Sequence, residues 1–182
     1  ILDYNKSNGV GSGVGNESRQ IGGISVLLKQ SLTEKWNYEL SARKEISDVY
    51  KSPVLFSAGS TFDFSKFYQL KFNISRNYRT PTFNDLYWKG SGNPNLLPED
   101  SYQAEVGNQF RYKDFRLTGT VYTSKIKDMI RWLPNNSGNW SPINTDNVSI
   151  YGAEALFGWK KNIDKHVLDF KGTYSYTVSL DD

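Results

Sequence analysis

The sequence contains no cysteine and a single histidine. Without cysteine there is no disulfide framework, no thiolate metal site and no cysteine nucleophile, and the redox compartment is left open. No apolar run approaches the roughly 20 residues that a transmembrane helix needs, so a helical membrane protein is excluded. A transmembrane β-barrel is not excluded, because its strands alternate apolar and polar residues and give a low average hydropathy.

Enzyme motifs are also missing: there is no G-x-S-x-G elbow, no P-loop and no cluster of metal-spaced histidines or cysteines. The single His166 lies beside a predicted turn, where an exposed turn residue is the simplest interpretation. The carboxylates Asp63, Glu105, Glu154 and Asp169 fall on the polar faces of different predicted strands, and cross-strand ion pairs are their ordinary explanation. We expect no enzyme, no catalytic residue, no metal site and no cofactor.

The composition narrows the remaining classes of protein. The 22 basic and 19 acidic residues give a net charge of +3 without a basic block, so nucleic-acid binding has little support. The aromatic share of 15% favours β-structure and matches the aromatic girdles of membrane barrels. Trp36 and Trp159 lie near predicted strand ends and are interpreted as interface anchors. A soluble aromatic-rich binding module would have a similar composition.

Alternation of apolar and polar residues is the main structural signal, because a period of two is typical of a strand. It predicts about eight antiparallel strands of roughly ten residues, longer than most soluble strands and close to the length that crosses a bilayer at a tilt. These strands are predicted at approximately residues 19–30, 36–46, 54–64, 68–75, 102–112, 115–121, 151–160 and 168–178.

The predicted connections alternate in length. Short turns are expected at 31–35, 65–66, 113–114 and 162–165, and longer loops at 1–18, 47–53, 78–100 and 133–147. The first of these longer loops, rich in glycine, serine and asparagine, is predicted to be mobile. Outer-membrane barrels join their strands by short turns on one side and long loops on the other, whereas a soluble β-sandwich has no reason to do so. We therefore predict a membrane barrel with its long loops outside and its short turns in the periplasm.

The two faces of the predicted strands differ in polarity. An apolar set would face lipid, including Tyr38, Leu40, Phe72, Ile74, Phe170 and Tyr174. A charged set would face the lumen, including Arg43, Lys71, Glu105, Arg111, Glu154 and Lys171. So many charges need water, so the barrel must be wide or plugged.

The turn-rich stretch 76–99 carries a resemblance to a known family. The run RTPTFNDLY at 79–87, followed by GNPNL at 92–96 and by Pro98-Glu99, resembles the paired boxes of TonB-dependent outer-membrane receptors. Downstream, Tyr122-x3-Ile126-x-Asp128-x-Ile130 and Asn147 with YGAE at 151–154 resemble later strand motifs of the family. The matching positions are Arg79, Pro81, Asp85, Leu86, Tyr87, Asn93, Pro94, Leu96, Pro98, Glu99, Glu105, Gly107, Gly152 and Glu154. One departure is Thr80, where the family usually has alanine.

The resemblance implies a 22-stranded barrel closed by a plug, in the outer membrane of a Gram-negative bacterium. Such receptors import a scarce ligand with energy from the TonB–ExbB–ExbD system. Residues 1–182 would be an internal part of the barrel domain, without the plug, the TonB box and the remaining strands. The implied partners are a siderophore or cobalamin type of small molecule, the TonB system and outer-membrane lipid. The alternative left open is a soluble aromatic-rich β-sheet module that binds carbohydrate.

Candidate ligand contacts lie in the predicted outer loops: Tyr87, Trp88, Asn93, Asn135, Asn136 and Trp140. A loop tryptophan can pack its own loop or stack on a ligand, and both interpretations remain open. The stretch between Pro81 and Asn93 has no histidine, so haem is not expected to bind through this loop, although Tyr87 could in principle ligate iron.

Eight strands would leave two open edges, which we expect to pair with further strands or another copy rather than with each other.

Overall fold

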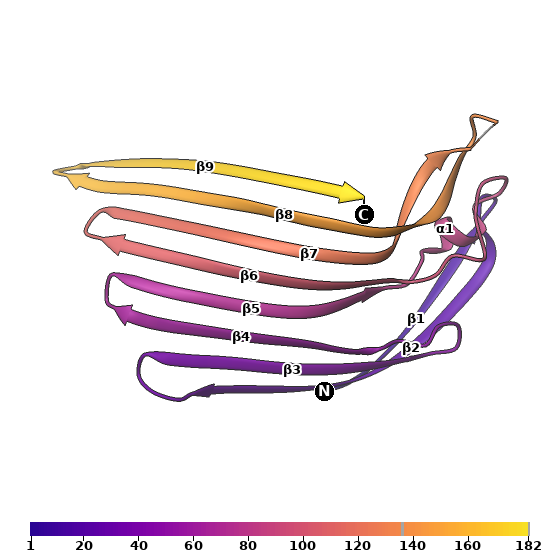
Figure 1. The fold of residues 1–182 in the computed structure, drawn as a ribbon, viewed down its shortest axis with the longest axis horizontal. Coiled ribbons are helices and arrows are strands. Elements are labelled where there is room, and N and C mark those ends of the chain that lie inside the picture. The colour runs from indigo at the N-terminus through magenta and orange to yellow at the C-terminus, as the bar shows by residue number, and fades with distance from the viewer. Residues whose placement is uncertain (136, 182) are drawn as a thin grey trace.

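The computed structural model describes residues 1–135 and 137–181, and they form one antiparallel sheet with a single short helix (Figure 1). The strands are β1 Leu2–Gly11, β2 Gly15–Ser31, β3 Trp36–Ser47, β4 Val54–Ser65, β5 Tyr68–Arg79, β6 Glu99–Tyr112, β7 Phe115–Pro134, β8 Trp140–Ile163 and β9 His166–Asp181. Helix α1 spans Phe83–Tyr87, between β5 and β6. Each strand pairs with its neighbours in sequence, and β1 and β9 form the two edges. The predicted all-β, antiparallel class is confirmed.

The number of strands is nine rather than about eight, because the start of the chain is not a loop. The prediction of a mobile loop at 1–18 was wrong. Strand β1 pairs with β2 along its whole length, from Leu2 opposite Ile24 to Gly11 opposite Gly15. An ion pair of 2.6 Å between Arg43 of β3 and Asp3 also holds this edge strand. Residues 2–11 are held in a strand by hydrogen bonds to β2 and by this ion pair. Local composition does not indicate either contact.

The register confirms the two faces of the sheet. Leu40, Ala58, Ile74 and Ala104 follow one another across β3 to β6, and we call the side that carries them the apolar face. Glu39, Gly59, Asn73 and Glu105 form the neighbouring row on the other side, which we call the polar face. The apolar face keeps large side chains exposed, such as Phe72 at 45% and Phe170 at 57%. Such exposure suits a lipid environment and not water.

Aromatic rings form a band on the apolar face at the end of the sheet where the short turns lie. Ring contacts join Trp36 to Phe62, Phe62 to Phe64, Phe64 to Tyr68, Phe67 to Tyr112, Phe115 to Phe157 and Trp159, and Trp159 to Phe170. At the opposite end, Phe56 contacts Tyr102. Tyr102 and Tyr112 lie on one strand about 33 Å apart at ~3.3 Å per residue, or about 25 Å along the membrane normal at a typical tilt. This is the height of an outer-membrane apolar band.

The connections alternate between the two ends of the sheet. The short turns 32–35, 66–67, 113–114 and 164–165 lie at one end, on the left of Figure 1, as predicted. The longer connections 48–53 and 80–98 lie at the other end, together with the short turn 12–14 and the tip of the β7–β8 hairpin, so the predicted difference in length holds only in part. We call this other end the loop end. The predicted loop 133–147 is mostly strand there, because Leu133 pairs with Ser141 and Pro134 with Trp140. Strands β7 and β8 bend before this extension, where Asp128 has a φ of 55°.

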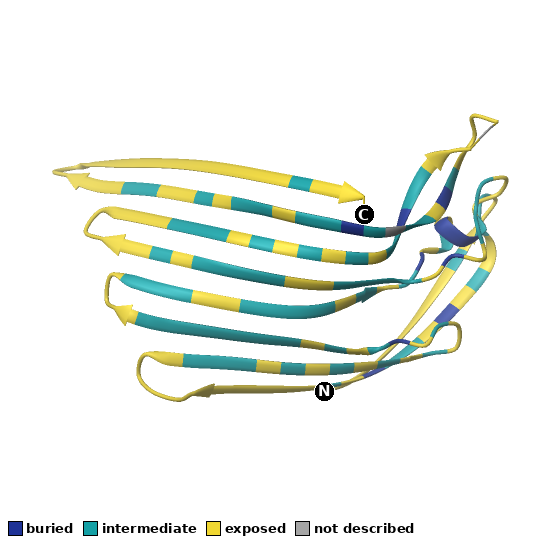
Figure 2. Cartoon of the chain, in the orientation of Figure 1, coloured by how far each residue is buried: buried dark blue, intermediate teal, exposed yellow. Residues whose placement is uncertain are grey.

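Burial concentrates at the loop end, around α1 and the bends of β2, β7 and β8 (Figure 2). Leu86, Leu96 and Ile130 form a small cluster, each at most 8% exposed, and Tyr87 packs against it. Pro81, Pro142 and Val148 are also fully buried. No helix in the described part of the chain is long and apolar enough to span a membrane. The tightest packing therefore lies in the segment with the family boxes.

Gly152 of β8 should be intolerant of a side chain. A Cβ there would lie 2.5 Å from both the Tyr122 hydroxyl oxygen and the Tyr176 carbonyl oxygen. The Tyr122 hydroxyl also forms a hydrogen bond of 2.6 Å with Thr177 Oγ1, so it cannot withdraw freely. We expect Gly152→Ala to destabilise the complete receptor by about 1–3 kcal/mol, measured by thermal unfolding in detergent.

Gly158 provides the matched control, since it lies on the same strand and the same face. A Cβ at Gly158 would meet nothing within 4 Å. Gly158→Ala should leave the unfolding temperature unchanged or raise it slightly, because alanine restricts the unfolded chain more than glycine does. Equal effects of the two substitutions would contradict the close approach of Tyr122.

Candidate functional site

The connection between β5 and β6, residues 80–98, is held on several sides, and we call it the hub loop. Helix α1 begins in it because Thr82 is an effective N-cap: its side chain accepts a hydrogen bond from Asp85 N. In return, the Asp85 carboxylate accepts from Thr82 N at 2.8 Å, which completes a capping box. Pro81 precedes the cap and favours extended backbone for the residue before it. The sequence T-x-x-D after a proline is thus enough to place a helical turn here.

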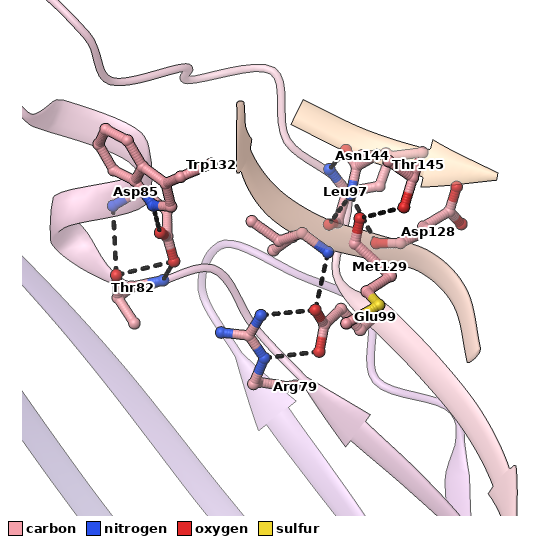
Figure 3. A network of polar contacts seen from close by, with 11 residues as sticks. Arg79, Thr82, Asp85, Leu97, Glu99, Asp128, Met129, Trp132, Asn144 and Thr145 are labelled. Carbon is pink, nitrogen blue, oxygen red and sulfur yellow. Dashed lines mark hydrogen bonds and ion pairs between the residues drawn. The ribbon is translucent and has the colours of Figure 1, made fainter. Parts of the chain in front are cut away.

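Asp85 links α1 to the extended hairpin of β7 and β8. The side chain is buried, and its Oδ1 accepts a hydrogen bond of 2.9 Å from Trp132 Nε1 (Figure 3). Burial opposes ionisation and is the largest single influence on the Asp85 pKa. Hydrogen bonds from Thr82 and Trp132, with the positive charge of Arg79, together outweigh burial and lower that pKa below its ordinary value. Asp85 is therefore a charged, fully hydrogen-bonded tie between two loops.

Arg79 and Glu99 close the base of the hub loop. Their side chains form a two-bonded ion pair at 2.6 and 2.5 Å, joining the end of β5 to the start of β6 (Figure 3). Glu99 Oε1 also accepts a hydrogen bond of 2.7 Å from Ile130 N in β7. The Glu99 side chain is 14% exposed and that of Arg79 is 48% exposed. Glu99 is thus the better-buried partner, and it joins three strands.

Asparagines fasten the second half of the hub loop to the hairpin of β7 and β8. Asn144 of β8 accepts from Leu97 N at 2.8 Å and donates to Leu97 O at 2.9 Å and Asp128 O at 2.7 Å (Figure 3). Asn93 donates to Pro142 O at 3.2 Å and accepts from Asn95 N at 3.0 Å. These amides satisfy the irregular backbone, which has no strand partner of its own.

The close packing around Gly92 explains why a glycine precedes the Asn93-Pro94 step. A Cβ at this position would lie 2.5 Å from Trp88 N and 2.7 Å from Leu86 O, both backbone atoms that cannot rotate away. The close approach lets Gly92 N donate a hydrogen bond to Trp88 O at 2.6 Å. Any side chain here would push the second box away from α1.

Arg19 of β2 holds the hub loop from the other side. Its guanidinium donates to Thr80 Oγ1 at 2.9 Å and to Pro81 O at 2.8 Å, and lies over the rings of Tyr50 and Phe83. It is a buried cation, 9% exposed. The turn between β1 and β2 adds a backbone bond of 2.7 Å from Lys89 N to Gly13 O. The β1–β2 hairpin and the segment between β3 and β4 therefore also pack against the hub loop.

Sequence reasoning found the hub loop but missed its outside partners. Arg19, Trp132 and Asn144 were not among the predicted site residues. Nothing in their local sequence marks them, since each is one residue of an ordinary strand. Thr80, noted as a departure from the family pattern, provides a hydroxyl that accepts from Arg19.

The candidate ligand residues fall into two groups. Tyr87 packs on the buried cluster and stacks on Phe83, and the polar atoms of Asn93 and Asn135 bond to nearby backbone. Asn136 lies outside the described residues. Trp88 is 46% exposed although it lies over Gly13, and Trp140 near the hairpin tip is 58% exposed. A role for these residues in ligand binding stays a prediction, and the two tryptophans have the most accessible surface.

The remaining family positions lie partly in the hub loop and partly on the polar face of the sheet. Pro94 is exposed and Pro98 half-buried within the hub loop. Glu105 and Gly107 lie on the polar face, in a shallow recess with Lys71 and Thr120. Gly152 and Glu154 lie on the same face of β8, where Gly152 makes room for Tyr122. The boxes thus belong to two regions, the hub loop and the polar face of the sheet.

The architecture by itself is typical of one class of protein. Long antiparallel strands, an apolar face with an aromatic band, and the longer loops collected at one end are features of a membrane-spanning β-barrel. A sequence model of the family described as TonB dependent receptor-like, beta-barrel, matches residues 2–182. The chain belongs to this family, and it is part of an outer-membrane barrel of a Gram-negative bacterium. Receptors of the family are not enzymes, in agreement with the expectation from the sequence.

Two relatives share substantial sequence identity. The chain is 33% identical over 141 residues to the vitamin B12 transporter BtuB of Photobacterium profundum, covering 74% of this chain and 23% of that protein. It is 47% identical over 83 residues to the vitamin B12 transporter BtuB of Vibrio vulnificus, covering 44% of this chain and 14% of that protein. The chain therefore spans less than a quarter of the length of these relatives.

Among solved structures, the siderophore receptor PirA from Pseudomonas aeruginosa is similar in fold. The TM-score is 0.81, with 17% identity, and the match covers 98% of this chain and 36% of that chain. At this identity the similarity shows the fold alone. Part of that larger chain thus has a similar arrangement of strands.

Acid should loosen the hub loop through Asp85. Because its pKa is lowered, ionised Asp85 stabilises the fold at pH values above the ordinary pKa of about 3.9, and this contribution is lost as the pH falls through the lowered pKa. We expect Asp85→Asn to cost about 1–3 kcal/mol at neutral pH, because one amide oxygen cannot replace both carboxylate oxygens. Thermal unfolding of the complete receptor at several pH values would measure it.

The difference in unfolding temperature between wild type and Asp85→Asn should shrink from pH 6 to pH 3. Asp114→Asn, in an exposed turn, is the control and should show no such trend. A difference that stays constant with pH would mean that the Asp85 charge has no part in holding the loop.

Glu99 should matter more than its partner Arg79. Glu99→Ala leaves the buried N–H of Ile130 without an acceptor, at a cost of about 1–3 kcal/mol. Arg79→Ala removes a half-exposed partner while Glu99 keeps its bond to Ile130, so at most about 1 kcal/mol is lost. Trypsin cleavage at the exposed Lys89 would report the loosening, faster for Glu99→Ala than for Arg79→Ala.

Asp100→Ala is the matched control for this comparison. Asp100 adjoins Glu99 but pairs with Arg76 on the apolar face. Its loss should leave cleavage at Lys89 unchanged. The reverse order of the Glu99 and Arg79 variants would show that Ile130 does not depend on Glu99.

Proposed function

We propose that this chain is part of the barrel of a TonB-dependent receptor that imports a cobalamin across the outer membrane. The observation that carries the ligand is the sequence identity of 33% and 47% to two vitamin B12 transporters. A siderophore receptor supports the fold but shares only 17% identity, so it favours that ligand less. Membership of an outer-membrane receptor family also argues against a soluble carbohydrate-binding module.

The loop end is the proposed entrance for the ligand, facing the cell exterior. Here the hub loop is fixed by Arg19, Trp132 and Asn144, so it presents its surface without losing much conformational entropy on binding. Trp88 and Trp140 keep exposed rings on this fixed support. A corrinoid has a large flat face, which suits contact with aromatic rings.

The polar face is the proposed lining of the lumen. Its strands carry charged side chains that pair with one another, including Arg43 with Asp3 of β1 and with Glu45 of its own strand. The open edges β1 and β9 would pair with the further strands of the barrel domain, and the lumen would hold a plug. The TonB–ExbB–ExbD system would supply the energy through a part of the receptor outside residues 1–182.

The test is binding of cyanocobalamin to the complete receptor that carries these residues, followed by uptake in cells with and without TonB. We expect saturable binding, and uptake only when TonB is present. Trp88→Ala and Trp140→Ala should each weaken binding by about fivefold or more, as loss of a contacting aromatic typically does. Trp36→Phe, in the aromatic band at the opposite end, is the control and should bind normally.

A ferric catecholate siderophore serves as the competing ligand in the same assay. Binding of the siderophore without binding of cyanocobalamin would replace the proposed ligand and keep the transporter class. Uptake that continues without TonB would contradict the transport mechanism itself.

A further inference from the structure

The backbone of Trp88 is held in place by the hub loop itself. Its N–H donates to Asn84 O at 3.1 Å, and its carbonyl oxygen accepts from Ser91 N at 3.0 Å and from Gly92 N at 2.6 Å. The direction of the Cα–Cβ bond is therefore set, and only the two side-chain torsion angles decide where the indole lies. The side chain is 46% exposed, so contact with the hub loop alone restricts these angles little.

The turn between β1 and β2, residues 12–14, supplies a further restraint on the indole. A Cβ on Gly13 would lie 3.1 Å from Trp88 Cζ3 and 3.4 Å from both Cε3 and Cη2. The benzenoid part of the indole thus lies directly against the backbone at Gly13. Lys89 N donates to Gly13 O at 2.7 Å, which ties the turn to the residue after Trp88. The turn covers one part of the ring and leaves the rest open to solvent.

The hairpin of β1 and β2 reaches the hub loop because both strands continue beyond the end of β3. The β2–β3 register ends at Ile21 opposite Ser47, and the rest of the hairpin leaves the sheet and crosses toward α1 (Figure 1). Arg19 fastens this part of the hairpin through its hydrogen bonds to Thr80 Oγ1 and Pro81 O. The turn is therefore held against Trp88 by contacts other than the ring itself.

The glycines of this hairpin differ in their surroundings. A Cβ on Gly9 would lie 2.8 Å from Phe83 Cδ2, so Gly9, like Gly13, lies close to an aromatic ring of the hub loop. Gly11 lies between them in the sequence, is exposed, and a Cβ there would meet nothing within 4 Å. Neither Gly11 nor Gly13 has a positive φ, so the backbone at both positions accepts a side chain. The two positions thus differ in contact with Trp88 and not in backbone strain.

We infer that Gly13 is a positioning residue of the ligand site, because the β1–β2 turn holds the Trp88 indole in the orientation that the ligand meets. The inference rests on the proposed function, in which Trp88 contacts the ligand. A ring that is already held loses little side-chain entropy on binding, so it binds more tightly than a freely rotating ring. A side chain at Gly13 would occupy the space of the indole and turn it away.

The first experiment needs no ligand. The complete receptor is labelled with fluorotryptophan, and the fluorine NMR resonance of Trp88 is identified by its loss in Trp88→Phe. Gly13→Leu should shift this resonance. The resonance of Trp132, identified in the same way, should stay in place because its indole is bonded to Asp85. Gly11→Leu is the matched control and should shift neither resonance.

Two results of this experiment would overturn the inference. One is a Trp88 resonance that Gly13→Leu leaves unchanged, which would mean that the turn does not restrain the ring. The other is an equal shift with Gly11→Leu, which would mean that the effect does not come from contact at Gly13.

The second experiment measures binding of cyanocobalamin to the same variants. Gly13→Leu should weaken binding by about fivefold or more, as Trp88→Ala is expected to do, and Gly11→Leu should bind as the wild type. Gly13→Leu combined with Trp88→Ala should bind no more weakly than Trp88→Ala alone, because two changes that act through one contact are not additive. Additive losses would show that Gly13 acts elsewhere and would refute its positioning role.

Gly13→Ala provides the test if Gly13→Leu does not fold. Its methyl group would lie 3.1 Å from Trp88 Cζ3, so the ring must move by only a few tenths of an ångström. We expect a smaller shift of the Trp88 resonance and a smaller loss of binding than leucine would cause. An unchanged resonance with Gly13→Ala would refute the restraint on the ring.

Failure of the proposed function would give a different result. A wild type that binds the ferric catecholate siderophore and not cyanocobalamin would refute the proposed ligand, and the same variants would then be measured with the siderophore. The fluorine shifts depend on neither ligand. Normal ligand binding by both Trp88→Ala and Gly13→Leu would refute the positioning role, whichever ligand the receptor takes.

Discussion

The loop end depends on one buried carboxylate, that of Asp85. It caps α1 through Thr82 and accepts the indole N–H of Trp132, so a local turn and a distant hairpin share one acceptor. A buried charge is costly unless its hydrogen bonds are satisfied, and three donors to the two Asp85 oxygens meet that condition. The same side chain makes both contacts. The helix and the hairpin therefore cannot separate without exposing the carboxylate to solvent or leaving it buried without its hydrogen bonds.

The other fastenings follow the same physical rule. Glu99 accepts from Arg79 and from Ile130 N, and Asn144 bonds the backbone of Leu97 and Asp128. Each places a side-chain acceptor or donor against a backbone group, and Leu97 and Asp128 have no partner of their own in the strand register. The hub loop is therefore ordered by polar contacts around a small apolar cluster, and Arg19 closes it from the β1–β2 side. Such a fixed loop would support the proposed recognition of a ligand by Trp88 and Trp140.

The two faces of the sheet are suited to two different environments, water on the polar face and lipid on the apolar face. The polar face carries the ion pair of Arg43 with Asp3 and the recess near Glu105, and the apolar face carries the aromatic band and exposed residues such as Phe170. Strand geometry imposes this division, because successive side chains point to opposite sides. Lys44 and Arg76 are exceptions on the apolar face, and both lie near its loop end.

The sequence by itself determined the strand class, the alternation of faces, the positions of the short turns and the position of the hub loop. These depend on local periodicity and on breakers such as Pro81 and Pro98, which act within a few residues. Only the tertiary structure decided that residues 2–11 form strand β1, that 133–147 continues a hairpin, and that Arg19, Trp132 and Asn144 meet the hub loop. These features arise from pairing and hydrogen bonds between segments far apart in the chain, and no local pattern encodes such partners.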